Sequence, residues 1–124
     1  MTVQKIKLAD KRSNCPVSCS LEVIGDKWSL LIIRDMLLFK KTTYNEFLAS
    51  NEGISTNILN DRLIKLTEMG LITFSGTEKR KKYTLTKIGM ELKPVMEAIA
   101  LFGMKHIEGI SSHAQKQMKT LQNK

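Results

Sequence analysis

The stretch "GISTNILNDRLIKLTEMGLI", residues 53–72, combines a helix cap, an apolar stripe and a helix stop. Ser55 is a typical N-cap residue, and Gly70 is a typical residue to follow a helix C-terminus. At about 100° per residue, the apolar side chains between them fall within about 140° of the helix circumference. They are Ile58, Leu59, Leu63, Leu66 and Met69. The sequence therefore predicts a helix over Ser55 to Met69 that packs inward with this face.

The opposite face of this helix is polar near its N-terminus. It carries Thr56, Asn57, Asn60, Asp61, Ile64, Lys65 and Thr67. Amides and hydroxyls hydrogen-bond to base edges in the major groove, and backbone N–H groups at a helix start suit a phosphate. We therefore expect DNA contacts from the helix start and from most of this polar face, namely from Ser55, Thr56, Asn57, Asn60, Asp61 and Lys65. The alternative is an ordinary solvated face, because every surface helix has a polar side.

Three further helices are predicted upstream. The run "VSCSLEVIG" after Pro16 fits a short helix closed by Gly25, and Asp26 can cap a second helix over 27–38. That second helix is apolar on nearly all sides, so we expect it to be the central buried element. Thr43 and Glu46 have capping-box spacing, which predicts a short helix from Tyr44 to about Ser50.

The short helix, the turn "NEG" and the helix from Ser55 complete a helix-turn-helix, in which the first helix supports the second in the major groove. Thr43, at the start of the supporting helix, is a further candidate DNA contact. Asp61 is expected to accept from a cytosine amino group or to pair with a nearby cation such as Lys65, because a lone carboxylate is repelled by phosphate.

A β-hairpin follows directly. "LITFS" and "KYTL" are short and rich in β-branched or aromatic residues, and "GTEKRK" separates them. The hairpin supplies a wing at residues 76–82, where four consecutive cations, Lys79, Arg80, Lys81 and Lys82, are placed to reach phosphates or a minor groove. The predicted fold is therefore mainly α with a small β-hairpin wing, a winged helix-turn-helix.

Composition limits the class of protein. The chain has 124 residues, 42% of them hydrophobic, which suits one domain, and its net charge of +8 favours a polyanionic partner. It contains no apolar run of the roughly 20 residues that a membrane helix needs and no signal-peptide core at its start. We therefore expect a cytoplasmic protein without membrane contact, with Cys15 and Cys19 as thiols.

The predicted domain spans residues 1–124. Residues 1–14 form a polar, basic arm, 15–85 the DNA-binding core, 86–110 the dimerisation helices and 111–124 a polar tail. Thr86 can cap a helix over 87–93, and Pro94 suits the first turn of a last helix over 94–110. That last helix is apolar on more than one face, which predicts a homodimer on a palindromic operator. The alternative is a helix that folds back on its own core. One broad face comprises Val95, Met96, Ile99, Ala100, Phe102, Ile107 and Ile110.

Several motifs together resemble a known family. "CP", "LEVIGDKWSLLIIRDML", the "RL" and "GLI" of the quoted stretch, and "YTLTKIGMELKPVMEAIALFG" are similar in order and spacing to the HxlR-type winged-helix regulators, relatives of the MarR group. The resemblance covers about residues 15–103. It implies a homodimeric regulator of promoters, expected to be a repressor, with its recognition helix at Ser55 to Met69 and its wing at Gly76 to Lys82. Members usually have a longer wing that contains proline, so this short tip is expected to contact phosphates.

The resemblance also implies that Cys15 can sense oxidants or electrophiles, since several members do so through a cysteine at the matching position. Physically, a thiolate at a helix start is stabilised by the helix dipole, and Lys11 and Arg12 add positive potential. Oxidation could then bridge the subunits and rotate their recognition helices. A plain packed thiol is the alternative. A metal site of Cys15, Cys19, His106 and His113 is disfavoured, because this spacing matches no known zinc module.

Other functions leave weaker traces in the sequence. It shows no nucleophile with a base, no phosphate-cradling glycine loop and no Cys-x-x-Cys motif, so we expect neither an enzyme nor a bound cofactor. The hypothesis of a thiol oxidoreductase that uses Cys15 and Cys19 therefore has little support in the sequence. A winged-helix module that binds protein or RNA without operator specificity remains the main alternative, and a small-molecule or oxidant effector is possible.

Overall fold

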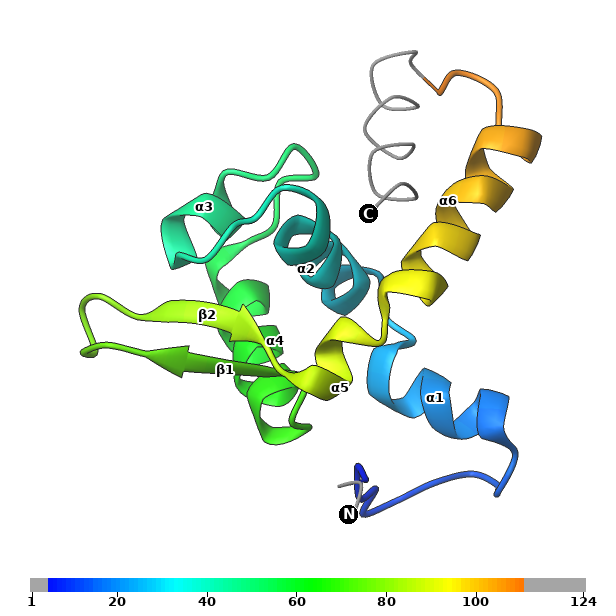
Figure 1. The fold of residues 1–124 in the computed structure, drawn as a ribbon, viewed down its shortest axis with the longest axis horizontal. Coiled ribbons are helices and arrows are strands. Elements are labelled where there is room, and N and C mark those ends of the chain that lie inside the picture. Colours follow the sequence, from blue (N-terminus) through cyan, green and yellow to red (C-terminus); the bar gives the residue numbers. More distant parts are fainter. Residues whose placement is uncertain (1–4, 111–124) are drawn as a thin grey trace.

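The computed structural model describes residues 5–110, and Figure 1 shows the arrangement of their helices and strands. The elements are α1 (Pro16–Ile24), α2 (Lys27–Leu38), α3 (Tyr44–Leu48), α4 (Thr56–Glu68), β1 (Ile72–Ser75), β2 (Lys82–Leu85), α5 (Lys87–Met90) and α6 (Lys93–His106). This order confirms the predicted winged helix-turn-helix. Residues 5–14 form no helix or strand, although Ile6 and Leu8 pack against the core. The predicted tail at 111–124 lies outside the described residues.

The predicted caps position the helices. Asp26 caps α2 by accepting from the backbone N–H of Ser29 at 2.9 Å, and Ser55 caps α4 by accepting from that of Ile58 at 3.2 Å. Thr43 and Glu46 form a capping box at the start of α3. Each cap satisfies a backbone donor that no residue inside the helix can accept from. The starts of these three helices are therefore confirmed.

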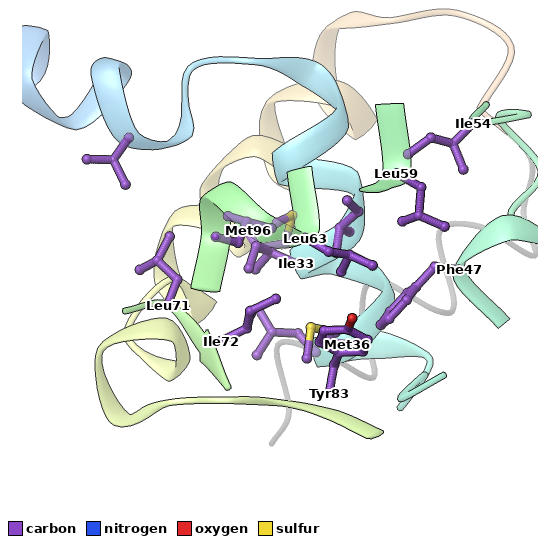
Figure 2. Close-up of a cluster of buried hydrophobic side chains, with 14 residues drawn as sticks. Ile33, Met36, Phe47, Ile54, Leu59, Leu63, Leu71, Ile72, Tyr83 and Met96 are labelled. Carbon is purple, nitrogen blue, oxygen red and sulfur yellow. The ribbon is translucent and has the colours of Figure 1, made fainter. Parts of the chain in front are cut away.

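The core lies between α2, α4 and the base of the hairpin, with single contributions from α1, α3 and α6 (Figure 2). From α4 the buried side chains are Leu59, Leu63 and Leu66, as the apolar stripe predicts. The aromatic rings of Phe47 and Tyr83 meet edge to face at 6.2 Å. The buried apolar residues are Val23, Ile32, Ile33, Met36, Leu37, Phe47, Ile54, Leu59, Leu63, Leu66, Leu71, Ile72, Tyr83 and Met96.

The hairpin is anchored at its base. β1 and β2 are antiparallel, with Ile72 opposite Leu85 and Ser75 opposite Lys82, and the backbone N–H of Tyr83 donates to the carbonyl of Thr42 at 2.7 Å. Glycine is required at position 89, since a Cβ there would lie 2.1 Å from the carbonyl oxygen of Leu71. This close approach seats α5 on the base of the hairpin, so only the tip projects from the molecule (Figure 1).

Three predicted helix ends are wrong. α3 ends at Leu48 instead of about Ser50, because the Ser50 hydroxyl turns inward to the buried Asp35 carboxylate. α5 ends at Met90 instead of continuing to 93, because Lys93 already belongs to α6. α6 ends at His106 instead of 110: Ile107 is extended, and Gly109 has a φ of 87°, which no right-handed helix accommodates. Ile107 and Ile110 are therefore not part of the helix face.

A buried charge cluster joins α2 to the turn before α4. Asp35 is only 2% exposed and accepts from Lys41 at 3.4 Å and from the Ser50 hydroxyl. Arg34 bridges Asp35 at 2.6 Å and Glu52 at 2.8 Å. The hydrogen bond from Arg34 lowers the pKa of Glu52. Because a buried carboxylate needs such partners, the cluster holds the turn of the helix-turn-helix in place.

A second ion pair ties α4 to the start of α2. Arg62 Nε donates to Asp26 Oδ1 at 2.9 Å, and its Nη1 contacts Asp61. Burial raises the pKa of Asp26, but the hydrogen bonds from Ser29 and Arg62 outweigh it and bring the pKa to about 2. Asp26 thus caps α2 and also forms an ion pair with α4 through Arg62.

The lowered pKa of Asp26 makes its contribution to stability dependent on pH. A depressed carboxyl pKa stabilises the fold above the unfolded pKa of about 3.9, and the contribution is lost as pH falls towards 2. We expect Asp26→Asn, which keeps the capping oxygen, to lower the free energy of unfolding by about 0.5 to 1 kcal/mol at pH 7. The difference from wild type should vanish between pH 4 and pH 2 in thermal denaturation. The exposed Glu68→Gln on α4 is the control, and a deficit of Asp26→Asn that does not vary with pH would contradict this role.

Candidate nucleic-acid interface

The polar stripe of α4 is open to solvent. Thr56, Asn57, Asn60 and Asp61 are all exposed, while the opposite side of the helix is buried against α2. Asn57 and Asn60 are therefore not packed inside the protein. A DNA contact requires that both amides be accessible in this way. Lys65 and Thr67 are half-buried instead, and the Thr67 hydroxyl donates to the Leu63 carbonyl at 2.7 Å. The part of α4 free to meet a ligand is therefore its N-terminal half and the middle of the stripe.

Two of the predicted contact residues have their hydroxyl groups engaged in capping. The Ser55 hydroxyl accepts from the backbone of α4, and the Thr43 hydroxyl accepts from the Glu46 N–H at 3.3 Å. The Glu46 carboxylate in turn accepts from the backbone N–H groups of Thr42 and Thr43, both at 3.0 Å, which lower the pKa of Glu46. Ser55 is exposed and Thr43 is half-buried. Both are positioned at helix starts, where a phosphate would also approach.

Asp61 pairs with a nearby cation, as expected, but the cation is not the example that the sequence suggested. Its carboxylate contacts Arg62, not Lys65. The reason is tertiary: Asp26 draws the Arg62 guanidinium towards the start of α2, and from there a second nitrogen reaches Asp61. Arg62 therefore offsets the negative charge that Asp61 would otherwise present to a phosphate backbone. Sequence reasoning did not identify Arg62, because its partner Asp26 lies 36 residues away in the chain.

The four cations of the wing differ in exposure and in their partners. Lys79, Arg80 and Lys82 are exposed, and among residues 5–110 they form no ion pair. Lys81 is held: its ammonium lies 4.5 Å from the centre of the Phe74 ring and 3.6 Å from a Glu78 carboxylate oxygen. The Phe74 ring packs in turn on Tyr83 at 5.8 Å. Lys81 thus stiffens the hairpin, and its three neighbours are the accessible charges.

An open groove of about 620 Å³ joins these parts. On one side it is lined by Asn60 of α4, on another by the first residues of α3, and on the third by the wing. It brings together Thr43, Asn60 and all four wing cations, which are far apart in the sequence. Tyr44 and Asn45 also line it and were missed. Their position at the start of the supporting helix was the available signal, since the first helix of this motif crosses the DNA backbone.

Cys15 is exposed at the N-cap position of α1. Its sulfur makes no capping hydrogen bond as a thiol, but the backbone N–H groups of Ser18 and then Val17 favour the thiolate and lower the pKa of Cys15. Cys19 is half-buried, and its thiol donates to the Ser13 carbonyl at 3.3 Å. The two cysteines therefore differ: Cys15 is the accessible and more acidic thiol.

Helices α1 and α6 lie away from the hairpin tip (Figure 1), and both expose large apolar side chains, which together we call the apolar surface. Met96, which the sequence assigned to the broad apolar face of the last helix, is instead buried in the core. The ring of His106 packs against that of Phe102, with their centres 5.2 Å apart and their planes tilted by 50°. Within residues 5–110 no helix is long and apolar enough to cross a membrane. The exposed apolar residues of the two helices are Val17, Leu21, Val95, Ile99, Leu101 and Phe102.

Comparisons of sequence identify the family of the chain. The family model of the HxlR-like helix-turn-helix matches residues 23–111. An uncharacterized HTH-type transcriptional regulator of Synechocystis sp. is 30% identical over 97 residues, which cover 76% of this chain and 71% of that protein. One of Mycobacterium tuberculosis is 32% identical over 94 residues, which cover 73% of this chain and 58% of its own length.

Solved structures share the fold. PA1607, described as a transcription factor, superposes with a TM-score of 0.71 at 36% identity, over 82% of this chain and 71% of that one. A Porphyromonas gingivalis W83 protein assigned to the MarR family gives 0.67 at 33% identity, over 82% and 99%. The oxidized redox regulator HypR gives 0.66 at 24% identity, over 77% and 100%, a likeness of fold alone. The chain is therefore a helix-turn-helix transcriptional regulator that belongs to the HxlR-like family.

Proposed function

We propose that the protein is a homodimer that binds a palindromic operator in double-stranded DNA and acts as a repressor. In this proposal α4 enters the major groove and Asn57 and Asn60 contact base edges, while Lys79, Arg80 and Lys82 contact phosphates. The observation that carries the proposal is the groove that Asn60 shares with the wing cations. A duplex that lies across this groove can present base edges to the Asn60 amide and its phosphate backbone to the wing cations.

The alternative is a module that binds protein or RNA. The major groove of an RNA duplex is too deep and narrow for a helix, so an exposed amide stripe on α4 favours DNA over duplex RNA. Three accessible lysine and arginine side chains beside the groove favour a polyanion over a protein. A salt dependence near zero on duplex DNA would favour the protein-binding alternative.

The apolar surface of α1 and α6 supports the dimer. Phe102 and Val17 are 63% and 67% exposed, although both are large and apolar. A small monomer seldom exposes several such residues together, and a twofold partner would bury them on both copies at once. Because this surface lies away from the wing, pairing would leave both copies of α4 free for half-sites about 34 Å apart (Figure 1).

Asn60 is the sharpest test of base recognition. Duplexes bound by the protein are first selected from a random pool, and Kd is then measured for variants of the selected site. We expect Asn60→Ala to cost about 1 to 3 kcal/mol and to relax the preference at one base pair per half-site, because a bidentate amide contact is lost. Equal weakening on all duplexes would contradict a base contact.

Lys79→Ala is the matched control for Asn60→Ala, because its side chain is exposed and unpaired among the described residues and so contributes charge alone. It should weaken selected and unselected duplexes alike and lower the salt slope of log K by about one. Lys81 is the poorer choice, since its removal would also disturb Phe74 and the hairpin.

The dimer is tested by sedimentation at micromolar concentration. We expect a species of about 28 kDa, twice the chain mass of 14.1 kDa, and a shift towards monomer for Phe102→Glu, because a charge there cannot be buried between copies. Ile64→Glu is the control: Ile64 is 61% exposed, nearly the same as Phe102, but lies on α4. A wild-type species of 14 kDa would contradict the dimer.

Cys15 supports a second, finer proposal: the protein responds to oxidants or electrophiles. Its sulfur is accessible and its pKa is lowered, so the reactive thiolate is more populated than in an ordinary thiol. Oxidation by diamide would join the Cys15 sulfurs of two protomers, with two protons and two electrons passing to diamide. The resulting disulfide would change the relative orientation of the two α4 helices.

We expect diamide to change operator affinity several-fold for wild type and for Cys19→Ser, and to leave Cys15→Ser unchanged. Cys19→Ser is the control because its thiol is half-buried and hydrogen-bonded to Ser13. Binding is measured by titration of the selected duplex with and without diamide, followed by a reductant to test reversal. The same response in Cys15→Ser as in wild type would contradict the sensor.

A further inference from the structure

Ile64 is the exception on the polar stripe of α4. It is 61% exposed, and it is the sole large apolar side chain of α4 that is exposed. The other apolar residues of this helix are buried in the core or packed against it. A single exposed isoleucine is ordinary on a protein surface, so exposure by itself assigns no role. Its neighbours on the helix are what matter.

Ile64 lies between the two exposed amides on the helix surface. At about 100° per residue it points within about 20° of Asn57 and about 40° of Asn60. With a rise of about 1.5 Å per residue, it lies about 10 Å along the helix from Asn57 and about 6 Å from Asn60. These spacings correspond to roughly three and two base-pair steps of a duplex. A helix that lays both amides on base edges therefore brings Ile64 to the same groove floor.

We infer that Ile64 contacts the C5-methyl group of a thymine in each half-site and thereby selects an A·T pair at that position. The inference rests on the proposed function, because it requires α4 to lie in the major groove. The thymine methyl is the apolar group of that groove, and an aliphatic side chain is its natural partner. A phosphate would offer Ile64 nothing, since the side chain can neither donate a hydrogen bond nor supply charge.

The alternative use of Ile64 is contact with protein. It lies on α4, whereas the exposed apolar residues suited to a second copy lie on α1 and α6, away from the wing (Figure 1). On its own stripe its neighbours are Asn57, Asn60 and Asp61, all polar and exposed. An isolated methyl contact inside a polar interface fits base readout, in which each side chain meets one base edge.

The experiment removes the methyl group of thymine and the Ile64 side chain beyond its Cβ in turn. The operator selected from a random pool is synthesised with deoxyuridine in place of each thymidine, and Kd is measured for wild type and Ile64→Ala. Burial of one methyl group corresponds to about a three- to fivefold change in affinity. We expect one thymidine per half-site whose replacement weakens wild type by that factor. Ile64→Ala should bind the thymidine duplex more weakly than wild type does. Its affinity should not fall further when deoxyuridine replaces thymidine at that position.

Two variants control for indirect effects. Ile64→Val keeps branched methyl groups and should retain sensitivity to the thymine methyl. Met90→Ala removes a 52% exposed apolar side chain from α5. Its Kd should change with deoxyuridine substitution as that of wild type does. Thermal denaturation checks that Ile64→Ala remains folded, as expected for an exposed site.

The outcomes separate this inference from the proposed function. If a sequence is enriched but no thymidine is sensitive, or Ile64→Ala is as sensitive as wild type, the Ile64 contact is overturned and DNA recognition stands. If no sequence is enriched from the pool, the proposed function is overturned and the Ile64 contact with it.

Discussion

The packing of α4 against α2 is the interaction on which the other features depend. Leu59, Leu63 and Leu66 are at most 3% exposed, and they bury one side of α4 completely. Burying three leucines stabilises the fold by several kcal/mol, on the order of 2 for each side chain. Because side chains are fixed around a helix, burying this face forces Asn57 and Asn60 outward. The core thus determines which side of α4 a ligand can meet.

Polar contacts refine the position that the leucines impose. The Arg62 to Asp26 pair holds α4 to the start of α2, and the Asp35 cluster holds the turn that leads into α4. Both contacts converge on α2, which also receives Val23 from α1 and Met96 from α6 in the core. The helix that supports the polar stripe of α4 therefore also supports the two helices with the exposed apolar surface. In the proposed sensor, a change at Cys15 would reach α4 through α2.

Local chemistry explains which predictions from the sequence were confirmed. Asp26, Thr43 and Ser55 cap the predicted helices, because capping needs only residues three positions apart. The apolar stripe of α4 and the strands of the hairpin follow from periodicities of a few residues. Two details that the sequence analysis did not predict depend on distant partners instead. The Ser50 hydroxyl shortens α3 by reaching Asp35, and Asp61 pairs with Arg62 because Asp26 places that guanidinium beside it.

By itself the sequence determined the helix starts, the hairpin, the buried face of α4 and the positive charge of the wing, since these depend on neighbouring residues. Only the tertiary structure placed Asn60, the start of α3 and the wing around one groove, and distinguished the held Lys81 from its accessible neighbours. It also showed that Met96, which the sequence placed on an apolar surface face, lies in the core. The physical reason is that a groove or an interface is made by residues far apart in the chain, whose distances depend on how the whole core packs.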